Sequence, residues 1–292
     1  MKHLISLLFL SALILISSCS GQDDNEWDYN GQQDTQPTKK SMSIGFSQAS
    51  LLTFAENNIT ELGIYVYLND SLVYGKNLPV NNGELQIEVP LGENLKTFAV
   101  ANAGEVLDAD SLTKVAVYQD ENCQKEIFMS EIKSFVSDKS VNEVTLELKR
   151  MVGQALLQPT ETSAELSAIT AFDALDVVFN NVVIGYKPGT GEYITGNATV
   201  NTRLADGYKA SVYSYPSPAD ILGNIEVIYL KENNEVTRTL RPLDVSLAYV
   251  ASKRIVVNMP ILDSDYLENP LPTTRLKSVN TSRGISVQEY QF

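Results

Sequence analysis

Apolar and polar residues alternate with a period of two through most of this chain, and this pattern constrains its fold more than any other feature. Met42, Ile44 and Phe46 alternate with small residues, and the segment 144–149 alternates apolar with polar residues. Successive side chains of a strand point to opposite faces of a sheet, so the pattern predicts half-buried β-strands. Turn-forming residues separate such segments, as at 232–234, and no segment shows a convincing amphipathic helix. The sequence therefore predicts an all-β fold.

The spacing of the strand-like segments predicts two tandem antiparallel β-sandwiches. We expect an N-terminal domain at 41–149 and a C-terminal domain at 150–292, with one extended segment, 144–157, passing from the first into the second. The segment 126–136 is compatible with a strand or with one or two helical turns. The other strands are expected at 64–68, 85–89, 95–101, 115–118, 175–184, 193–200, 208–215, 225–230, 236–240 and 255–259.

Residues 1–18 predict a signal peptide rather than a folded element. Lys2 supplies a positive charge, residues 4–16 form an apolar core, and small residues precede Cys19. The apolar core is shorter than the about 20 residues that a membrane-spanning helix needs. The pattern predicts a lipoprotein signal that is cleaved between Ser18 and Cys19. The alternative is an ordinary secretory signal followed by an incidental cysteine.

A lipid anchor at Cys19 would follow from this cleavage. The thiol would carry a diacylglyceryl group and the amine a further acyl chain such as palmitate, and more than one chain gives stable membrane attachment. Residues 19–40 are polar and predict a lipidated flexible linker. The paired acids Asp23 and Asp24 resemble an export signal of lipoproteins, so we expect the chain on the outer membrane, facing the cell exterior. A periplasm-facing anchor is the alternative.

The two cysteines, Cys19 and Cys123, leave no intramolecular disulfide once the first carries lipid. Stability must then come from core packing. Cys123 stands among the acids of residues 120–124, a context that would not lower its pKa, so we expect an inert thiol.

The composition excludes several classes of function. The formal net charge of −14 argues against nucleic acid as a partner, because an acidic surface repels phosphate groups. The only histidine, His3, lies in the predicted signal peptide. The mature chain therefore lacks the histidine of Ser-His-acid and Cys-His catalytic sites and of histidine-bearing metal sites. We expect no enzyme activity, no cofactor and no metal site; a carboxylate-pair glycosidase is the enzymatic alternative, since it needs only two acids at a defined separation.

Three segments resemble the fimbrillin superfamily of Bacteroidota, which contains fimbrial shaft subunits and the lipoproteins that anchor or cap fimbriae. They are 59–67, 95–104 and 144–157, the last with Lys149-Arg150-Met151-Val152-Gly153 at its centre. The resemblance covers residues 41–160 by sequence and the remainder by strand pattern. It implies that the two sandwiches are transthyretin-like.

The resemblance also implies assembly by strand complementation, in which one subunit donates a strand to a groove of its neighbour. Shaft subunits of the family lose an amino-terminal strand to an arginine-directed protease, whereas the first arginine here is Arg150. Lys39 and Lys40 remain a candidate site for a lysine-directed or trypsin-like protease. This departure from the shaft pattern favours an uncleaved anchor.

The carboxyl-terminal segment is the candidate donor strand. It carries the apolar residues Ile285, Val287, Tyr290 and Phe292. The alternation slips between Val287 and Tyr290, which predicts a bulge or a short strand. The alternative is that the segment completes its own domain.

We therefore predict a surface lipoprotein that acts in cell adhesion as a fimbrial anchor or accessory fimbrium subunit. Its expected partners are other fimbrial subunits, through donor-strand exchange, and the outer membrane, through the acyl chains at Cys19. The alternative is a surface glycan-binding lipoprotein of a polysaccharide uptake system. Such a protein would present exposed aromatic residues on a domain face, whereas the only tryptophan, Trp27, lies in the predicted linker.

Overall fold

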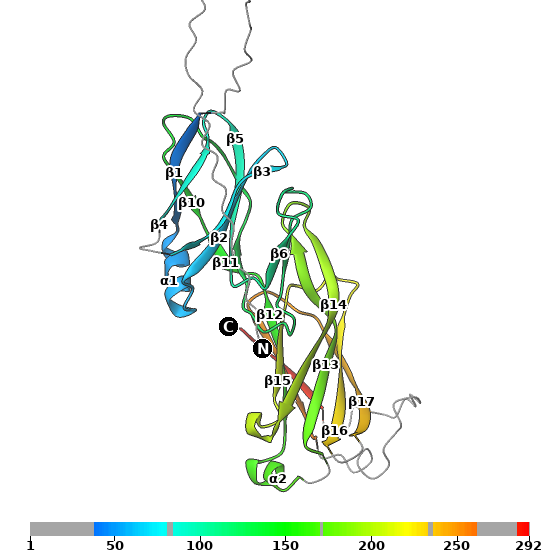
Figure 1. Cartoon of the computed structure of the whole chain (residues 1–292). Coiled ribbons are helices and arrows are strands. Elements are labelled where there is room, and N and C mark those ends of the chain that lie inside the picture. Colours follow the sequence, from blue (N-terminus) through cyan, green and yellow to red (C-terminus); the bar gives the residue numbers. More distant parts are fainter. Residues whose placement is uncertain (1–37, 81–83, 170–171, 233–235, 262–284, 292) are drawn as a thin grey trace, which may run out of the picture. The chain divides into compact units, whose positions relative to one another are not determined.

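The computed structural model describes residues 38–80, 84–169, 172–232, 236–261 and 285–291. Within these ranges β-strands dominate, and the helical elements are α1 (Gln48–Glu56), α2 (Ser163–Ser167) and a 3-10 turn at Leu204–Asp206. The strands form sheets whose neighbours are antiparallel in all but two pairs (Figure 1). The predicted all-β sandwich fold is confirmed.

The first sandwich is formed by two sheets that pack around one apolar core. One sheet has the order β10-β1-β4; the other has the order β11-β8-β5-β2-β3, with β9 paired to β5. The alternation in the sequence explains the packing, because Leu85, Ile87 and Val89 are buried in this core while Gln86 and Glu88 face solvent. The strands are β1 (Lys39–Phe46), β2 (Glu61–Leu68), β3 (Ser71–Pro79), β4 (Glu84–Pro90), β5 (Asn94–Ala101), β8 (Phe128–Ser130), β9 (Lys133–Val136), β10 (Glu143–Leu146) and β11 (Leu148–Arg150).

The second sandwich is built in the same style around its own core. One sheet has the order β15-β12-β18-β19; the other has the order β17-β16-β13-β7-β6, with β14 also paired to β13. Val177, Phe179 and Val257 are among the fully buried residues of this core. The strands are β6 (Glu105–Leu107), β7 (Ala116–Tyr118), β12 (Gly153–Pro159), β13 (Ala174–Lys187), β14 (Glu192–Arg203), β15 (Ala210–Ser214), β16 (Gly223–Glu232), β17 (Val236–Leu247), β18 (Lys253–Met259) and β19 (Ser286–Gln291).

The first strand of each sandwich is paired in the same way. β1 pairs antiparallel with β4 and parallel with β10. β12 likewise pairs antiparallel with β15 and parallel with β18. The first strand of each sandwich is therefore held on both edges, by an antiparallel strand and by a parallel strand that comes late in the same sandwich.

The hairpin β6–β7 joins the two halves of the chain. It comes from the first half of the sequence but pairs with β13, placing Tyr118 opposite Gly185. A third apolar cluster lies here and includes Phe98 of β5, Val117 of β7 and the fully buried Tyr215, which follows β15. The domain limits expected from the sequence, 41–149 and 150–292, stay a prediction.

The crossover between the sandwiches is extended, as expected for 144–157: β10, β11 and β12 follow one another from Glu143 to Pro159. Helix α1 is fastened to this crossover. The hydroxyl of Ser50, which is fully buried, accepts a hydrogen bond of 2.8 Å from the backbone N–H of Leu148. This bond gives a partner to a buried donor at the first residue of β11.

Candidate functional site

The candidate donor strand forms β19, an edge strand of the second sandwich, drawn in red in Figure 1. It pairs antiparallel with β18 in one continuous register that places Val287 opposite Val257 and Gln291 opposite Lys253. No bulge interrupts the pairing of these residues, so the strand is short rather than bulged. All of its residues from Ser286 to Gln291 are exposed to solvent.

Few side-chain contacts hold β19 in place. Ile285 packs against the second core, whereas Val287 and Tyr290 remain 47% and 49% exposed. The cross-strand polar contacts are weak. The side chains of Asn258 and Ser286 lie 3.3 Å apart, and Lys253 and Glu289 form a solvent-exposed ion pair of 3.9 Å. Val287 and Tyr290 lie on opposite faces of the strand, because side chains alternate in an unbroken register. Phe292 lies outside the described residues.

The candidate proteolytic site, Lys39-Lys40, lies inside a paired strand. Lys39 stands opposite Pro90 and Lys40 opposite Val89 in the ladder of β1 and β4. The ammonium group of Lys40 also donates hydrogen bonds to the backbone carbonyls of Asp138 and Val141. A protease must extract a paired segment before it can cut there. The next basic residue along the chain is Lys76, in β3.

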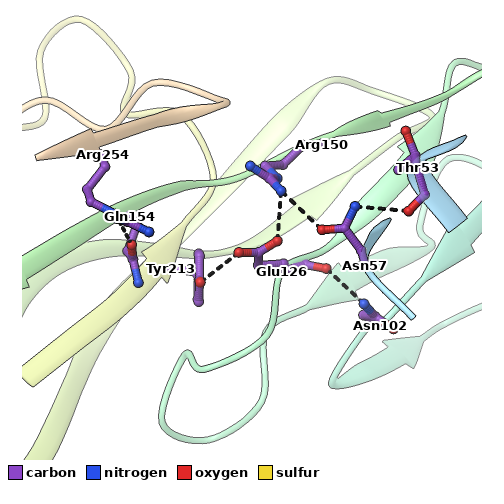
Figure 2. Close-up of polar contacts among 8 residues, drawn as sticks. All are labelled: Thr53, Asn57, Asn102, Glu126, Arg150, Gln154, Tyr213 and Arg254. Carbon is purple, nitrogen blue, oxygen red and sulfur yellow. Dashed lines mark hydrogen bonds and ion pairs between the residues drawn. The ribbon is translucent and has the colours of Figure 1, made fainter. Parts of the chain in front are cut away.

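Arg150, the first arginine of the chain, is also enclosed. It ends β11 and makes an ion pair of 2.9 Å with Glu126, in which the two side chains are 18% and 25% exposed. Its guanidinium group donates to the side-chain oxygen of Asn57 at 3.2 Å (Figure 2). The same group lies 5.4 Å from the ring centre of Phe128. The residue is therefore a structural contact rather than an accessible cleavage site.

Glu126 connects this arginine to the second sandwich, and we call Asn57, Asn102, Glu126, Arg150 and Tyr213 the junction network. The hydroxyl of Tyr213, in β15, donates to the Glu126 carboxylate at 2.7 Å, and the side chain of Asn102 donates to the Glu126 carbonyl at 3.2 Å (Figure 2). Burial, and next the hydrogen bond to Glu126, raise the pKa of Tyr213 to about 12. Sequence reasoning missed this network, because no motif relates residues so far apart in the chain.

The remaining sequence predictions fall outside the described residues or on buried positions. Ser18, Cys19 and Trp27 are outside the described ranges. Cys123 is fully buried, and burial raises the pKa of its thiol to about 12, which fits the expected inert thiol. In the described part of the chain, no helix is long and apolar enough to span a membrane, and no group of three or more His, Cys, Asp or Glu side chains gathers as a metal site would require.

No protein-family model matches the chain, and no curated protein matches it significantly in sequence. Solved structures do resemble it. A candidate polysaccharide-binding protein from Bacteroides thetaiotaomicron matches with a TM-score of 0.50 and 11% identity, over 76% of this chain and 92% of that one. A candidate adhesin from Bacteroides ovatus matches with a TM-score of 0.50 and 8% identity, over 69% and 82%. A fimbrial assembly protein from Parabacteroides distasonis matches with a TM-score of 0.41 and 14% identity, over 77% and 93%.

The first two matches carry the structural comparison. Each spans most of both chains, so the likeness extends over both sandwiches rather than over one of them. Their sequence identities are far too low for residue roles to be transferred. What this chain shares with these bacterial proteins is its fold.

Proposed function

We propose that this chain is a lipid-anchored surface protein that acts as a fimbrial anchor or accessory fimbrium subunit and assembles by strand complementation. The observation that carries the proposal is β19: an exposed edge strand at the carboxyl end of the chain, paired through its backbone and hardly buried. A neighbouring subunit with an unpaired sheet edge would offer this strand the same backbone partners that β18 offers.

The energetics of β19 favour exchange. Ordering each residue of a strand costs about 1 to 2 kcal/mol of conformational entropy, and each backbone hydrogen bond returns about 1 kcal/mol. Burial of apolar side chains normally decides the balance, and in β19 that burial is largely missing because Val287 and Tyr290 are half-exposed. The cost of ordering β19 is therefore close to the free energy that its hydrogen bonds return. Because Val287 and Tyr290 lie on opposite faces, a partner's groove would bury one of them, and that burial would favour the exchanged state.

The position of the basic residues favours an anchor over a shaft subunit. Cleavage after Lys40 would leave residues 41–46 of β1 paired with β4 and β10. No lysine or arginine then occurs before Lys76, which lies within β3. A protease directed at basic residues therefore has no site at which to release β1 and open a groove in the first sandwich. The chain would donate its last strand while keeping its first.

The two solved structures with a TM-score of 0.50 support a surface role, since one is a candidate adhesin and the other a candidate polysaccharide-binding protein. Attachment through acyl chains at Cys19 and an outward-facing position on the outer membrane complete the proposal. It assigns the chain no catalytic role.

Capture of partners from the cell surface tests the assembly mechanism. The lipidated protein and a variant lacking residues 285–292 would each be cross-linked on cells and purified from outer membranes. We expect the intact protein to recover a ladder of fimbrial subunits and the truncated variant to lose it. A variant with Glu88→Gln, on the exposed face of β4, is the control and should keep the ladder. Recovery of a nutrient transporter in place of fimbrial subunits would overturn the proposal.

Cell fractionation tests the lipid anchor separately. We expect Cys19→Ala to move the protein from the membrane fraction to the soluble fraction, because the acyl chains are its only proposed attachment to the membrane. Persistence of the variant in the membrane fraction would refute the lipid model.

A further inference from the structure

A cavity of about 460 Å³ opens where the hairpin that begins with β6 passes the outer face of the first sandwich. Its size lies within the roughly 300 to 1,000 Å³ of typical small-molecule sites. The floor comes from β2, β3 and β5, and the wall comes from residues 102–106 together with Lys125. The cavity shares no residue with β1 or β19, so it plays no part in the strand exchange proposed above.

An aromatic ring and a missing side chain shape the floor. Tyr65 lies parallel to Phe98, with 5.2 Å between the ring centres, and this contact fixes its orientation. Gly63 leaves the space beside the Tyr65 ring open, because a Cβ atom there would stand 3.0 Å from the ring and 3.0 Å from the Asn77 side-chain oxygen. The floor thus offers a fixed ring with room next to it.

The wall is held in place by the protein itself. Asn102 adopts a left-handed backbone with φ of 59°, and its side chain donates to the Glu126 carbonyl of the junction network (Figure 2). Gly104 packs against the backbone of Gln119 and Asp120, where a Cβ atom would come within 2.4 Å of three backbone atoms. Its N–H donates to the Tyr118 carbonyl at 2.9 Å. A wall that is already ordered avoids the entropy cost of ordering on binding.

Four polar side chains at the cavity are left unused: Glu61, Asn77, Glu105 and Lys125. Among the residues that the structure describes, none of these side chains has a hydrogen-bond or ion-pair partner. Together they supply two carboxylates that accept, an amide that both donates and accepts, and an ammonium that donates. These four side chains surround the floor that carries the Tyr65 ring.

We infer that this cavity binds a neutral glycan through a hexose unit. Each sugar hydroxyl both donates and accepts, so a ring of hydroxyls needs the mixture of acceptors and donors that the four side chains supply. The apolar C–H face of a pyranose matches the face of an aromatic ring such as Tyr65. Two carboxylates against one ammonium make the local charge negative, and the chain carries a net charge of −14, so sulfated and sialylated glycans are repelled.

A glycan array tests the inference with the full mature chain solubilised in detergent. The array carries neutral hexose oligosaccharides, N-acetylhexosamine oligosaccharides, and sialylated and sulfated glycans. We expect binding to neutral glycans, and we expect the double variant Asn77→Ala, Glu105→Gln to weaken that binding about 10-fold or more in calorimetric titration, as the loss of two hydrogen bonds implies. Both residues are exposed and without partners among the described residues, so the fold should survive, as circular dichroism can check.

Glu88→Gln is the matched control, because Glu88 is an exposed acid of the same sandwich outside the cavity. Its binding should equal that of the parent chain. Absence of binding to any neutral glycan, binding to acidic glycans only, or equal binding by the double variant and the control would each overturn the inference. The subunit ladder measures assembly and the array measures glycan binding, so either proposal can fail without the other.

Discussion

The ion pair between Glu126 and Arg150 should stabilise this protein far more than its neighbour along the chain, the pair of Glu131 with Lys149. The two pairs differ in burial. The side chains of the first are 25% and 18% exposed, and those of the second are 85% and 54% exposed. Glu126 also accepts a hydrogen bond from Tyr213 at 2.7 Å. We therefore compare Glu126→Gln with Glu131→Gln, since each substitution removes one charge and preserves the shape of the side chain.

The expected losses can be set from these contacts. A hydrogen bond to a charged group contributes about 1.5 to 3 kcal/mol. The amide of Glu126→Gln carries no charge, so the ion pair with Arg150 is lost even if the amide NH2 donates to the Tyr213 hydroxyl. We expect the free energy of unfolding to fall by about 2 to 3 kcal/mol for Glu126→Gln and by about 0 to 1 kcal/mol for Glu131→Gln, because exposed pairs contribute little.

Urea unfolding of the mature chain, followed by circular dichroism, measures both losses. A second measurement checks the cause, because Glu126 contributes to the raised pKa of Tyr213. In Glu126→Gln this tyrosine should ionise at lower pH, as ultraviolet absorbance of tyrosinate can show, whereas Glu131→Gln should leave its titration unchanged. Equal losses of stability in the two variants would refute the reasoning that the junction network is a strong contact.

Three further outcomes are expected. Burial raises the pKa values of Tyr213 and Cys123 to about 12 from ordinary values of 10 and 9, so the unfolded state loses these protons at lower pH than the folded state. The free energy of unfolding should therefore hold below pH 9 and fall as the pH rises to about 12. A urea midpoint that stays unchanged over that range would contradict this. Ser50→Ala should cost about 1 to 3 kcal/mol in urea unfolding, because the N–H of Leu148 loses its buried acceptor; a loss below about 0.5 kcal/mol, which is ordinary for surface positions, would argue against it. Limited trypsin digestion should leave a folded core that retains residues 41–46, as mass spectrometry can establish, and a core that begins beyond Lys76 would show that β1 is released.

The strands of both sandwiches were largely predictable from the sequence, because a strand with one face in the core must alternate. Leu85, Ile87 and Val89 show the pattern in its clearest form, and all three are buried. Helix α1 was not predicted. Of its residues only Ser50 and Phe54 are buried, so it carries no continuous apolar stripe, and its one local signal is the capping hydroxyl of Ser47, which accepts from the N–H of Ser50.

Contacts between distant parts of the chain could not be predicted from the sequence. The pairing of β7 with β13 depends on Gly185, which leaves room for the ring of Tyr118. The sequence around either residue does not indicate that the two are paired. The ion pair of Arg150 with Glu126 and the cavity beside Tyr65 arise in the same way, from strands and loops that packing brings together. Strand alternation reports which face of a segment is buried but not which segment lies against it.

The parallel pairing of β1 with β10 and of β12 with β18 determines how each sandwich would bear tension. The paired residues run from Ser43 to Phe46 of β1 against β10, and from Gln154 to Pro159 of β12 against β18. In a parallel pair, the amino end of one strand and the carboxyl end of the other lie at opposite ends of the ladder. A pull between those two ends loads every rung at once, in shear, rather than opening the rungs one after another. Once β19 is donated to a neighbouring subunit, as proposed above, a load on the carboxyl side would reach β18 at its carboxyl end and would act along this resistant direction.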